Sequence, residues 1–343
     1  MPKSLIARVI LGVLALLVLA VVAGGSFLAL KKPAQRPAST ETVERTPERL
    51  ARGKYLAEVQ LNCMGCHTPP EPTRWSLLGD PAQIGSGGLC WDEQMEFPGK
   101  LCSKNLTPDT ETGLGAWTDG EIIRAFREGI ARDGTPLFPV MPYLEYRAVS
   151  DEDARALVVY LRSLKPLRTS LPPRELKPPL SIIVKFMPKP LQGPVSPPDH
   201  TDAVAYGKYL AGVSGCRMCH TPVNERHEPV PGKDFAGGQL FKYGAMVVKS
   251  ANLTPHATGL GDRTKEAFIG MFRAFGAPEM ASAKIPPANN TVMPWLTYSA
   301  LTDEDLGAIY AYLRTVPAIE NTVERRPPPA PAAGGTAAPA AAH

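Results

Sequence analysis

The two halves of the chain carry the same short sequence signatures in the same order, and this duplication constrains the fold more than any other feature. Each half contains Gly-Lys-Tyr-Leu-Ala, then Cys-x-x-Cys-His-Thr-Pro, Asn-Leu-Thr-Pro, Thr-Gly-Leu-Gly, Met-Pro and Asp-Glu-Asp. Met141 follows His67 by 74 residues, and Met293 follows His220 by 73. Self-similarity of this kind predicts two copies of one structural unit.

The pentapeptides at 63–67 and 216–220 have the spacing through which a c-type haem is attached. Two cysteines three residues apart fit on one helical turn, where they can form thioethers with the two vinyl groups of a porphyrin, and the adjacent histidine can bind the iron. A zinc site and a redox dithiol are the alternatives, but paired zinc motifs usually lie about 15–20 residues apart, and a thioredoxin-like motif needs a βαβ context. The sequence therefore predicts two covalently bound haem c groups. Their thioether cysteines and histidine ligands are Cys63, Cys66, His67, Cys216, Cys219 and His220.

Helix signals dominate both repeats and predict an all-α chain. In the first repeat, Thr46 precedes a helix that begins with Pro47, Thr118 and Glu121 form a capping box, and Ser150 precedes a last helix. The equivalent caps of the later helices in the second repeat are Thr264 and Thr302.

Two glycines, Gly53 and Gly207, fall inside the first helix of each repeat, where glycine costs up to about 1 kcal/mol relative to alanine. We expect each to allow a close crossing with the last helix, near Tyr160 and Tyr312. An incidental glycine is the alternative.

The amino terminus predicts a membrane anchor. Residues 9–30 carry no charge and would form a helix of about 33 Å, enough to cross a bilayer. We therefore expect a transmembrane signal anchor over residues 5–30, in the cell inner membrane. A single pass would place the haem domains on the periplasmic side, because c-type attachment takes place outside the cytoplasm. Val21-x-Ala23 also permits cleavage, so removal of the segment is the alternative. Residues 33–46 are polar and predict a flexible tether.

The rest of the chain divides by composition. The two repeats span 45–168 and 200–318, and a proline-rich linker, 169–199, separates them. The apolar residues in this linker predict that it packs along the domains. Residues 319–343 are rich in proline and alanine, which predicts a disordered tail. The formal net charge of +4 is small for 343 residues and argues against a nucleic-acid partner.

These signatures resemble class I cytochromes c, over both repeats. The Asn-Leu-Thr-Pro, Thr-Gly-Leu-Gly and Met-Pro-Tyr segments are similar to those of cytochrome c subunits of membrane-bound alcohol and gluconate dehydrogenases. Those subunits typically hold three haems, whereas this chain has two motifs. The resemblance implies two tandem class I cytochrome c domains after the transmembrane helix, with Met141 and Met293 as the second axial ligands. A thioether ligand opposite histidine raises the haem potential. Bis-histidine ligation through His200, His227 or His256 is the alternative.

Other residues are candidates for holding the haem or its loop. Asn105, Trp117, Asn252 and Arg263 are candidate contacts for the haem propionates, which need donors when partly buried. Turn formation is the alternative for these residues. Cys90 and Cys102 are expected to form a disulfide in an oxidising compartment. The alternative for one of them is thiolate ligation of iron, as in some dihaem thiosulfate-oxidising cytochromes.

With both axial positions filled, the chain is expected to relay single electrons, without substrate chemistry of its own. Its partners would be a respiratory donor, such as a membrane-bound dehydrogenase, and an oxidase or soluble carrier. The alternative is a dihaem enzyme, such as a peroxidase or a thiosulfate dehydrogenase, which requires an iron with an open coordination position.

Overall fold

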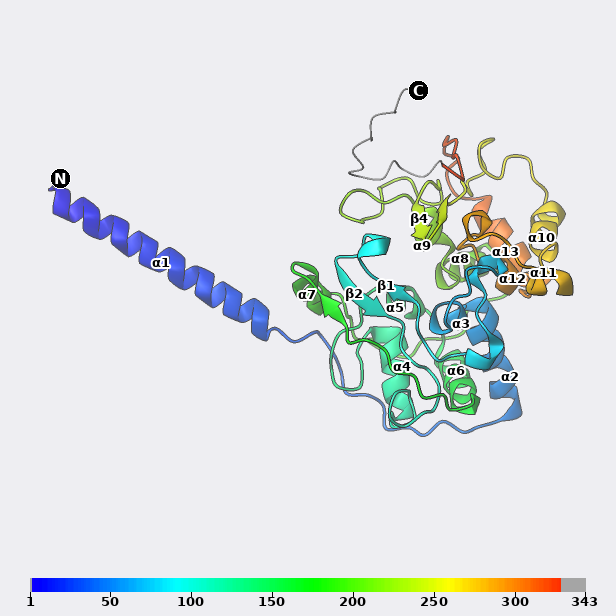
Figure 1. Ribbon diagram of the computed structural model, residues 1–343, viewed down its shortest axis with the longest axis horizontal. Helices are drawn as coiled ribbons and strands as arrows, with labels where there is room; N and C mark the ends of the chain where they lie inside the picture. Colours follow the sequence, from blue (N-terminus) through cyan, green and yellow to red (C-terminus); the bar gives the residue numbers. More distant parts are fainter. Residues whose placement is uncertain (1, 328–343) are drawn as a thin grey trace, which may run out of the picture. The chain divides into compact units, whose positions relative to one another are not determined.

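The computed structural model describes residues 2–327, so the end of the predicted tail, 328–343, lies outside the described residues. Within them the chain is mostly helical with little sheet (Figure 1). The helices are α1 (Lys3–Leu30), α2 (Pro47–Tyr55), α3 (Cys63–His67), α4 (Asp119–Glu128), α5 (Tyr143–Tyr146), α6 (Asp151–Ser163), α7 (Leu180–Ile183), α8 (Ala203–Val213), α9 (Cys216–His220), α10 (Lys265–Arg273), α11 (Pro278–Ser282), α12 (Trp295–Tyr298) and α13 (Asp303–Leu313). The strands are β1 (Cys90–Trp91), β2 (Gly99–Cys102), β3 (Glu175–Leu176), β4 (Leu240–Tyr243) and β5 (Met246–Lys249).

The chain forms two compact units that do not follow the repeats strictly. The first unit comprises the residues up to Leu56 together with Gly85–Pro197, and the second comprises Ala57–Ile84 together with the chain from Pro198 on. The segment with the first Cys-x-x-Cys-His motif therefore belongs to the second unit. In that unit, Arg74 donates to the carbonyl of Ala281 at 3.1 Å and Asn290 donates to the carbonyl of Pro72 at 2.8 Å.

A close helix crossing organises each unit, as the glycines predict. A Cβ on Gly53 of α2 would stand 1.9 Å from the carbonyl oxygen of Ala156 in α6 and 2.9 Å from Cβ of Tyr160. A Cβ on Gly207 of α8 would stand 1.8 Å from the carbonyl oxygen of Ala308 in α13. The expectation of one crossing per repeat is thus confirmed, because only glycine allows the two backbones to approach this closely.

Local sequence signals set the helix starts. The Thr46 side chain accepts from the backbone of Arg49, with Pro47 at the first turn. Thr118 and Glu121 form the predicted capping box at the start of α4. Ser150, Thr264 and Thr302 cap α6, α10 and α13, where each side chain accepts from the backbone N–H three residues on. Satisfying the free N–H groups of a first turn contributes about 1 kcal/mol per cap.

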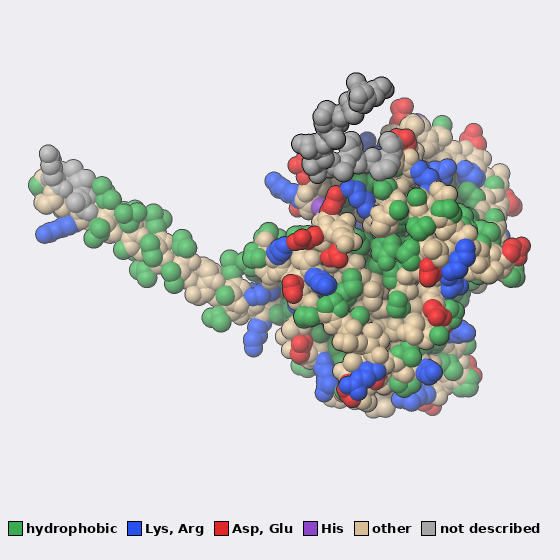
Figure 2. All heavy atoms as spheres, in the orientation of Figure 1, with side chains coloured by type: hydrophobic (Ala, Val, Ile, Leu, Met, Phe, Trp, Pro, Cys, Tyr) green, Lys and Arg blue, Asp and Glu red, His purple; other side chains and the backbone are tan. Residues whose placement is uncertain are grey.

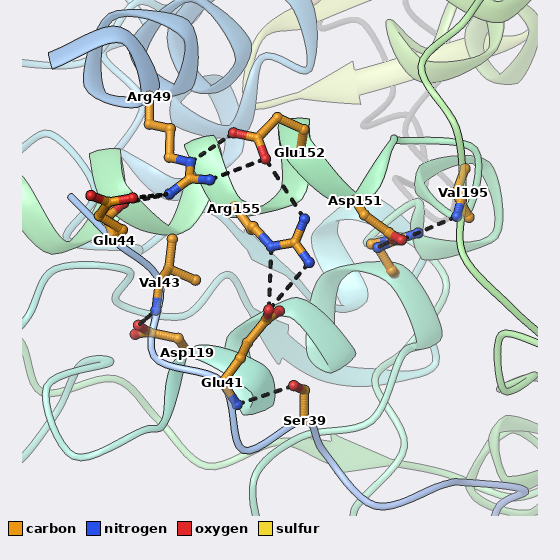
Figure 3. A network of polar contacts seen from close by, with 11 residues as sticks. Ser39, Glu41, Val43, Glu44, Arg49, Asp119, Asp151, Glu152, Arg155 and Val195 are labelled. Carbon is orange, nitrogen blue, oxygen red and sulfur yellow. Dashed lines mark hydrogen bonds and ion pairs between the residues drawn. The ribbon is translucent and has the colours of Figure 1, made fainter. Parts of the chain in front are cut away.

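The polar segment 33–46 is not the free tether that its composition predicts. The buried Val43 donates its N–H to Asp119 at 3.0 Å, and Glu41 pairs with Arg155 at 3.2 Å (Figure 3). Earlier in the segment, Arg36 pairs with the buried Glu128 at 2.8 Å. The prediction of flexibility was wrong because these partners lie far away in sequence and leave no local signal.

The proline-rich linker also packs on the first unit, although of the apolar residues at 182–186 that predict this packing only Val184 is buried. β3 pairs with β2 in a three-stranded antiparallel sheet, in the order β1-β2-β3. Arg147 donates to the carbonyl of Lys189. The N–H of Val195 donates to Asp151 at 3.3 Å (Figure 3). Asp151 is also bound by the buried Arg127 at 2.7 Å.

Helix α1 is long and apolar enough to cross a membrane, by length and composition, over Arg8–Leu30. No part of this span is buried against the rest of the chain, and hydrophobic side chains cover it (Figure 2). A signal sequence has the same properties, so the helix by itself does not distinguish an anchor from a leader.

Candidate haem sites

Both Cys-x-x-Cys-His motifs form the single helical turn that their spacing predicts. The turn is α3 in the first repeat and α9 in the second, and each follows a residue with left-handed backbone. This residue is Asn62 at φ 49° before α3 and Gly215 at φ 73° before α9. The two cysteines of each motif therefore lie one turn apart on the same helix face, as attachment to one porphyrin requires.

His220 has the geometry of an oriented axial ligand. Its side chain is buried, and Nδ1 lies 2.7 Å from the carbonyl oxygen of Ala251. Because a carbonyl can only accept, Nδ1 carries the proton and Nε2 keeps its lone pair for a metal. Burial lowers the pKa of His220, which favours the neutral ring that ligation needs.

Glycines allow a close approach to the segment before Asn-Leu-Thr-Pro in both repeats, and in the second repeat this approach includes the attachment loop. Gly237, at φ +73°, donates its N–H to the carbonyl of His220 at 2.7 Å, and a Cβ there would lie 2.4 Å from the carbonyl carbon of Ala251. In the first repeat, Gly87 has φ +80°, and a Cβ there would lie 2.5 Å from the carbonyl oxygen of Ser103. Both positions require a backbone that other residues rarely adopt.

The four motif cysteines are poorly suited to thiolate chemistry. Burial raises the pKa of Cys63 and Cys216 to about 12, because a thiolate is poorly solvated there. Within residues 2–327, no group of three or more His, Cys, Asp or Glu side chains is arranged to hold a metal ion. Among the described residues, neither motif therefore has the additional Cys, His, Asp or Glu side chains that would complete a zinc site.

The second unit contains both attachment turns. The hydroxyl of Ser214 donates to the carbonyl of Gln60 at 2.8 Å, and these residues lie two and three positions before the first cysteine of their motifs. Tyr298 of α12 donates its hydroxyl to the carbonyl of Ser214. Burial first, and then the four motif cysteines, raise the pKa of Tyr298 well above its usual value. The cysteines of both motifs therefore lie within electrostatic range of one buried tyrosine.

Gln60 is a polar residue whose role the sequence did not suggest. Its side chain is fully buried, and neither the amide nitrogen nor the amide oxygen has a hydrogen-bond partner among the described residues. A buried amide without partners costs about 1–3 kcal/mol, so it needs a polar group that a bound molecule can supply. Gln60 lies three residues before Cys63. The sequence could have indicated its role only through the presence of a glutamine at the end of the first helix of the repeat.

The two Met-Pro segments have matching backbone conformations. Pro142 and Pro294 have φ, ψ of −79°, 49° and −80°, 59°, and each starts a short helix, α5 or α12. The N–H two residues beyond each methionine donates to the methionine carbonyl, at 2.7 Å for Met141 and 2.8 Å for Met293. Both methionine side chains are half-buried. The two methionines therefore precede turns of the same backbone shape, Met141 in the first unit and Met293 in the second.

The Asn-Leu-Thr-Pro asparagines, which are candidate propionate contacts, form hydrogen bonds within the protein. Asn252 donates to Thr258 at 3.1 Å and to the carbonyl of Ile319 at 2.9 Å, and its oxygen accepts from Thr254. Asn105 makes the same set of bonds with Thr112, Leu167 and Thr107. Both amide N–H bonds are used in each case, which leaves no donor for an anion. The turn-forming alternative therefore fits better, because each side chain ties down the segment that follows the last helix.

We predict that Asn252→Ala will lower the free energy of unfolding by about 2–3 kcal/mol, because it leaves the N–H of the buried Thr254 without a partner and removes one of the two hydrogen bonds to the Ile319 carbonyl. Denaturant unfolding of the purified protein measures this loss. The exposed Asn224→Ala serves as the control. A shift in haem potential with unchanged stability would instead restore the propionate assignment.

The remaining candidates are Trp117, Arg263 and the pair Cys90 and Cys102. Trp117 is half-buried, and its carbonyl accepts from Arg162 at 2.5 Å. Arg263 is exposed. Cys90 and Cys102 form a disulfide that pins β1 to β2, so neither is a free thiolate.

The histidines of the bis-histidine alternative have other contacts. His200 is exposed, stacks on Tyr206 and lies 3.3 Å from Glu304. His256 lies 3.0 Å from the hydroxyl of Thr258, and His227 is exposed in a turn. None of these contacts involves a motif cysteine or histidine.

Comparison with known proteins finds cytochrome c relatives. Residues 204–317 match the family model for cytochrome c. The chain is 31% identical to the fructose dehydrogenase cytochrome subunit of Gluconobacter japonicus over 279 residues. This aligned stretch covers 78% of this chain and 53% of that protein. It is 31% identical over 286 residues to the gluconate 2-dehydrogenase cytochrome c subunit of Pantoea cypripedii, which covers 77% of this chain and 59% of the relative.

A relative of matching length has two haems by name. The diheme cytochrome c-type protein of Cereibacter sphaeroides is 27% identical over 312 residues, which covers 89% of this chain and 97% of that protein. The chain spans only about half the length of the fructose dehydrogenase subunit.

Proposed function

Because the chain belongs to the cytochrome c family, we propose that it is a dihaem c-type cytochrome that relays single electrons between protein partners. In this proposal the two repeats are tandem class I cytochrome c domains, each with one covalent haem c. A bound haem supplies one iron that changes between the ferrous and ferric states. The protein's own residues attach, orient and shield that group.

The observation that carries the proposal is the environment of the second motif. Cys216 and Cys219 lie one turn apart, and the Nδ1–H bond to Ala251 leaves Nε2 of His220 available. These residues fit a haem c, since they offer two attachment thiols and one oriented ligand. Met293 lies before α12, whose Tyr298 is close to the same cysteines, and so is a suitable second ligand from this unit. Met141 is proposed for the first haem by repeat symmetry.

Electron exchange within one chain is supported by the shared location of the attachment turns. The Ser214–Gln60 hydrogen bond joins the residues just before the two motifs at 2.8 Å. The unpaired amide of Gln60 is proposed to bind a haem propionate there, in place of the asparagines. Two filled axial positions would leave no coordination position for a substrate, which favours relay over catalysis.

The site of action is proposed to be the periplasmic face of the cell inner membrane, with α1 as a retained single-pass anchor. The named relatives are cytochrome subunits of fructose and gluconate dehydrogenases. A membrane-bound dehydrogenase subunit is therefore the proposed donor, and an oxidase or soluble carrier the acceptor.

We predict two haems per chain, measured as pyridine haemochrome against protein mass, and two electrons taken up per chain in a reductive titration. In-gel peroxidase staining after denaturing electrophoresis tests covalent attachment. The Cys216→Ala, Cys219→Ala double variant should keep one haem, because the two motifs act separately. A dihaem enzyme would instead contain a high-spin haem that binds cyanide or peroxide rapidly.

The donor is identified by purifying the intact chain from membranes and identifying the subunits that accompany it. Reduction of the haems on addition of that dehydrogenase's substrate is the expected result. If the companion subunits reduce a quinone without reducing this chain, then the relay assignment is wrong.

A further inference from the structure

The middle of the linker presents apolar side chains to solvent. The turn at residues 180–187 consists of α7 and the short helical segment Val184–Phe186. Val184 is buried and holds the turn on the first unit, whereas Ile183 is 47% exposed and Phe186 is 49% exposed. Ile183 and Phe186 are three positions apart, so they lie on the same side of the turn. Exposing both to water is unfavourable, which points to an apolar partner.

The 180–187 turn is attached to the carboxy-terminal end of α1 (Figure 1). Lys185 Nζ donates to the carbonyls of Leu28 and Ala29, at 3.1 and 2.8 Å. The last carbonyls of a helix have no partner within the helix, so a lysine there is a favourable cap. The ammonium group of Lys31 lies 5.9 Å from the ring centroid of Phe186. Both contacts lie within the first unit.

These contacts fix the depth of the turn relative to α1. The uncharged stretch of α1 ends at Leu30, and Lys31 and Lys32 follow directly. Lysines at the end of a membrane-spanning helix lie among the lipid headgroups. Because Lys185 and Phe186 contact this same end, the turn lies at the same level. Aromatic and aliphatic side chains beside lysines suit this boundary between headgroups and acyl chains.

We propose that the 180–187 turn is a second membrane contact of this protein. Ile183 and Phe186 enter the outer surface of the bilayer that α1 spans, Lys31 and Lys32 bind lipid phosphates, and Lys185 holds the turn against the end of α1. The inference rests on the proposed role of α1 as a retained anchor. Together with the packed segment 33–46, this contact holds the first unit at one orientation over the membrane. A membrane-bound partner would then meet a defined face of the protein.

The test places a fluorescent label at one position of the full-length protein in lipid vesicles. Phe186→Cys carries an NBD label, in vesicles of phosphatidylcholine and phosphatidylglycerol with and without lipids that carry a nitroxide near the headgroup. Because Cys90 and Cys102 are paired and the motif cysteines are proposed to hold haem, the introduced thiol is the reactive one. An unchanged haem spectrum verifies the fold. Leu50→Cys on α2, where Leu50 is 39% exposed, is the matched control.

A third label, at Leu17→Cys within α1, reports the anchor itself through lipids with the nitroxide deep in the acyl chain. The expected result is loss of about half or more of the emission at position 186, with no loss at position 50 and deep quenching at position 17. Quenching at 17 with position 186 equal to position 50 overturns this inference and leaves the anchor intact. Absence of quenching at 17 overturns the anchor assignment, and the inference with it.

Discussion

Gly207→Ala is expected to destabilise the second unit by about 3 kcal/mol or more. The added Cβ would stand 1.8 Å from the carbonyl oxygen of Ala308 and 2.9 Å from Cβ of Tyr312. Both obstacles are fixed parts of α13, so no flexible side chain can move aside. Either α8 or α13 must shift, and each carries fully buried residues such as Leu210 and Leu306. Denaturant unfolding of the full chain, followed by helix content, measures the loss.

A matched control separates this crossing from the general effect of glycine in a helix. Gly270 lies inside α10 of the same unit, and a Cβ there meets nothing within 4 Å. Gly270→Ala should therefore stabilise the protein by about 0.4–1 kcal/mol, since alanine restricts the unfolded chain more than glycine does. Equal midpoints for the two variants would mean that the crossing is not close in solution.

The crossing was predictable because an unfavourable residue occurs at the same helix position in both repeats. Glycine is unfavourable inside a helix, so its presence at both Gly53 and Gly207 requires a reason outside the helix. The caps were predictable for a related reason, because the bonds of Thr118 and Thr302 reach only three residues along the chain. The caps depend only on residues that are close to one another in the sequence.

The packing of residues 33–46 was not predictable, because its partners are distant in sequence. Val43 is bound by Asp119, and Arg36 by Glu128, some 76 and 92 residues further on. A polar segment with prolines has the composition of a flexible linker, whether or not such partners exist. Val43 is the one buried residue of this segment, and a single valine gives no periodic hydrophobic pattern in the sequence.

The attachment turns were predictable as local structure, but their shared location was not. Cys-x-x-Cys-His specifies one helical turn and two thiols on one face, and both α3 and α9 have that form. The Ser214–Gln60 contact joins residues 154 positions apart, which no motif spacing encodes. Gln60 was missed for the same reason, since its buried amide is evident only after folding.

The second large effect is expected at the proposed axial ligand. Met293→Ala should lower the potential of one haem by on the order of 100 mV, because the thioether favours ferrous iron and its removal leaves water or an open position. The same variant should bind cyanide or carbon monoxide rapidly at that haem, with both haems still covalently attached. Redox titration and ligand-binding kinetics on the full chain measure the two effects.

Two further variants decide what the change means. Met280→Ala removes a thioether from α11 of the same unit and should leave the spectrum and both potentials unchanged. Met293→His should lower the potential as Met293→Ala does but keep the haem closed to cyanide, because histidine refills the position. Wild-type potentials in both Met293 variants would show that another residue binds this iron, and the assignment of Met141 by repeat symmetry would then lose its basis.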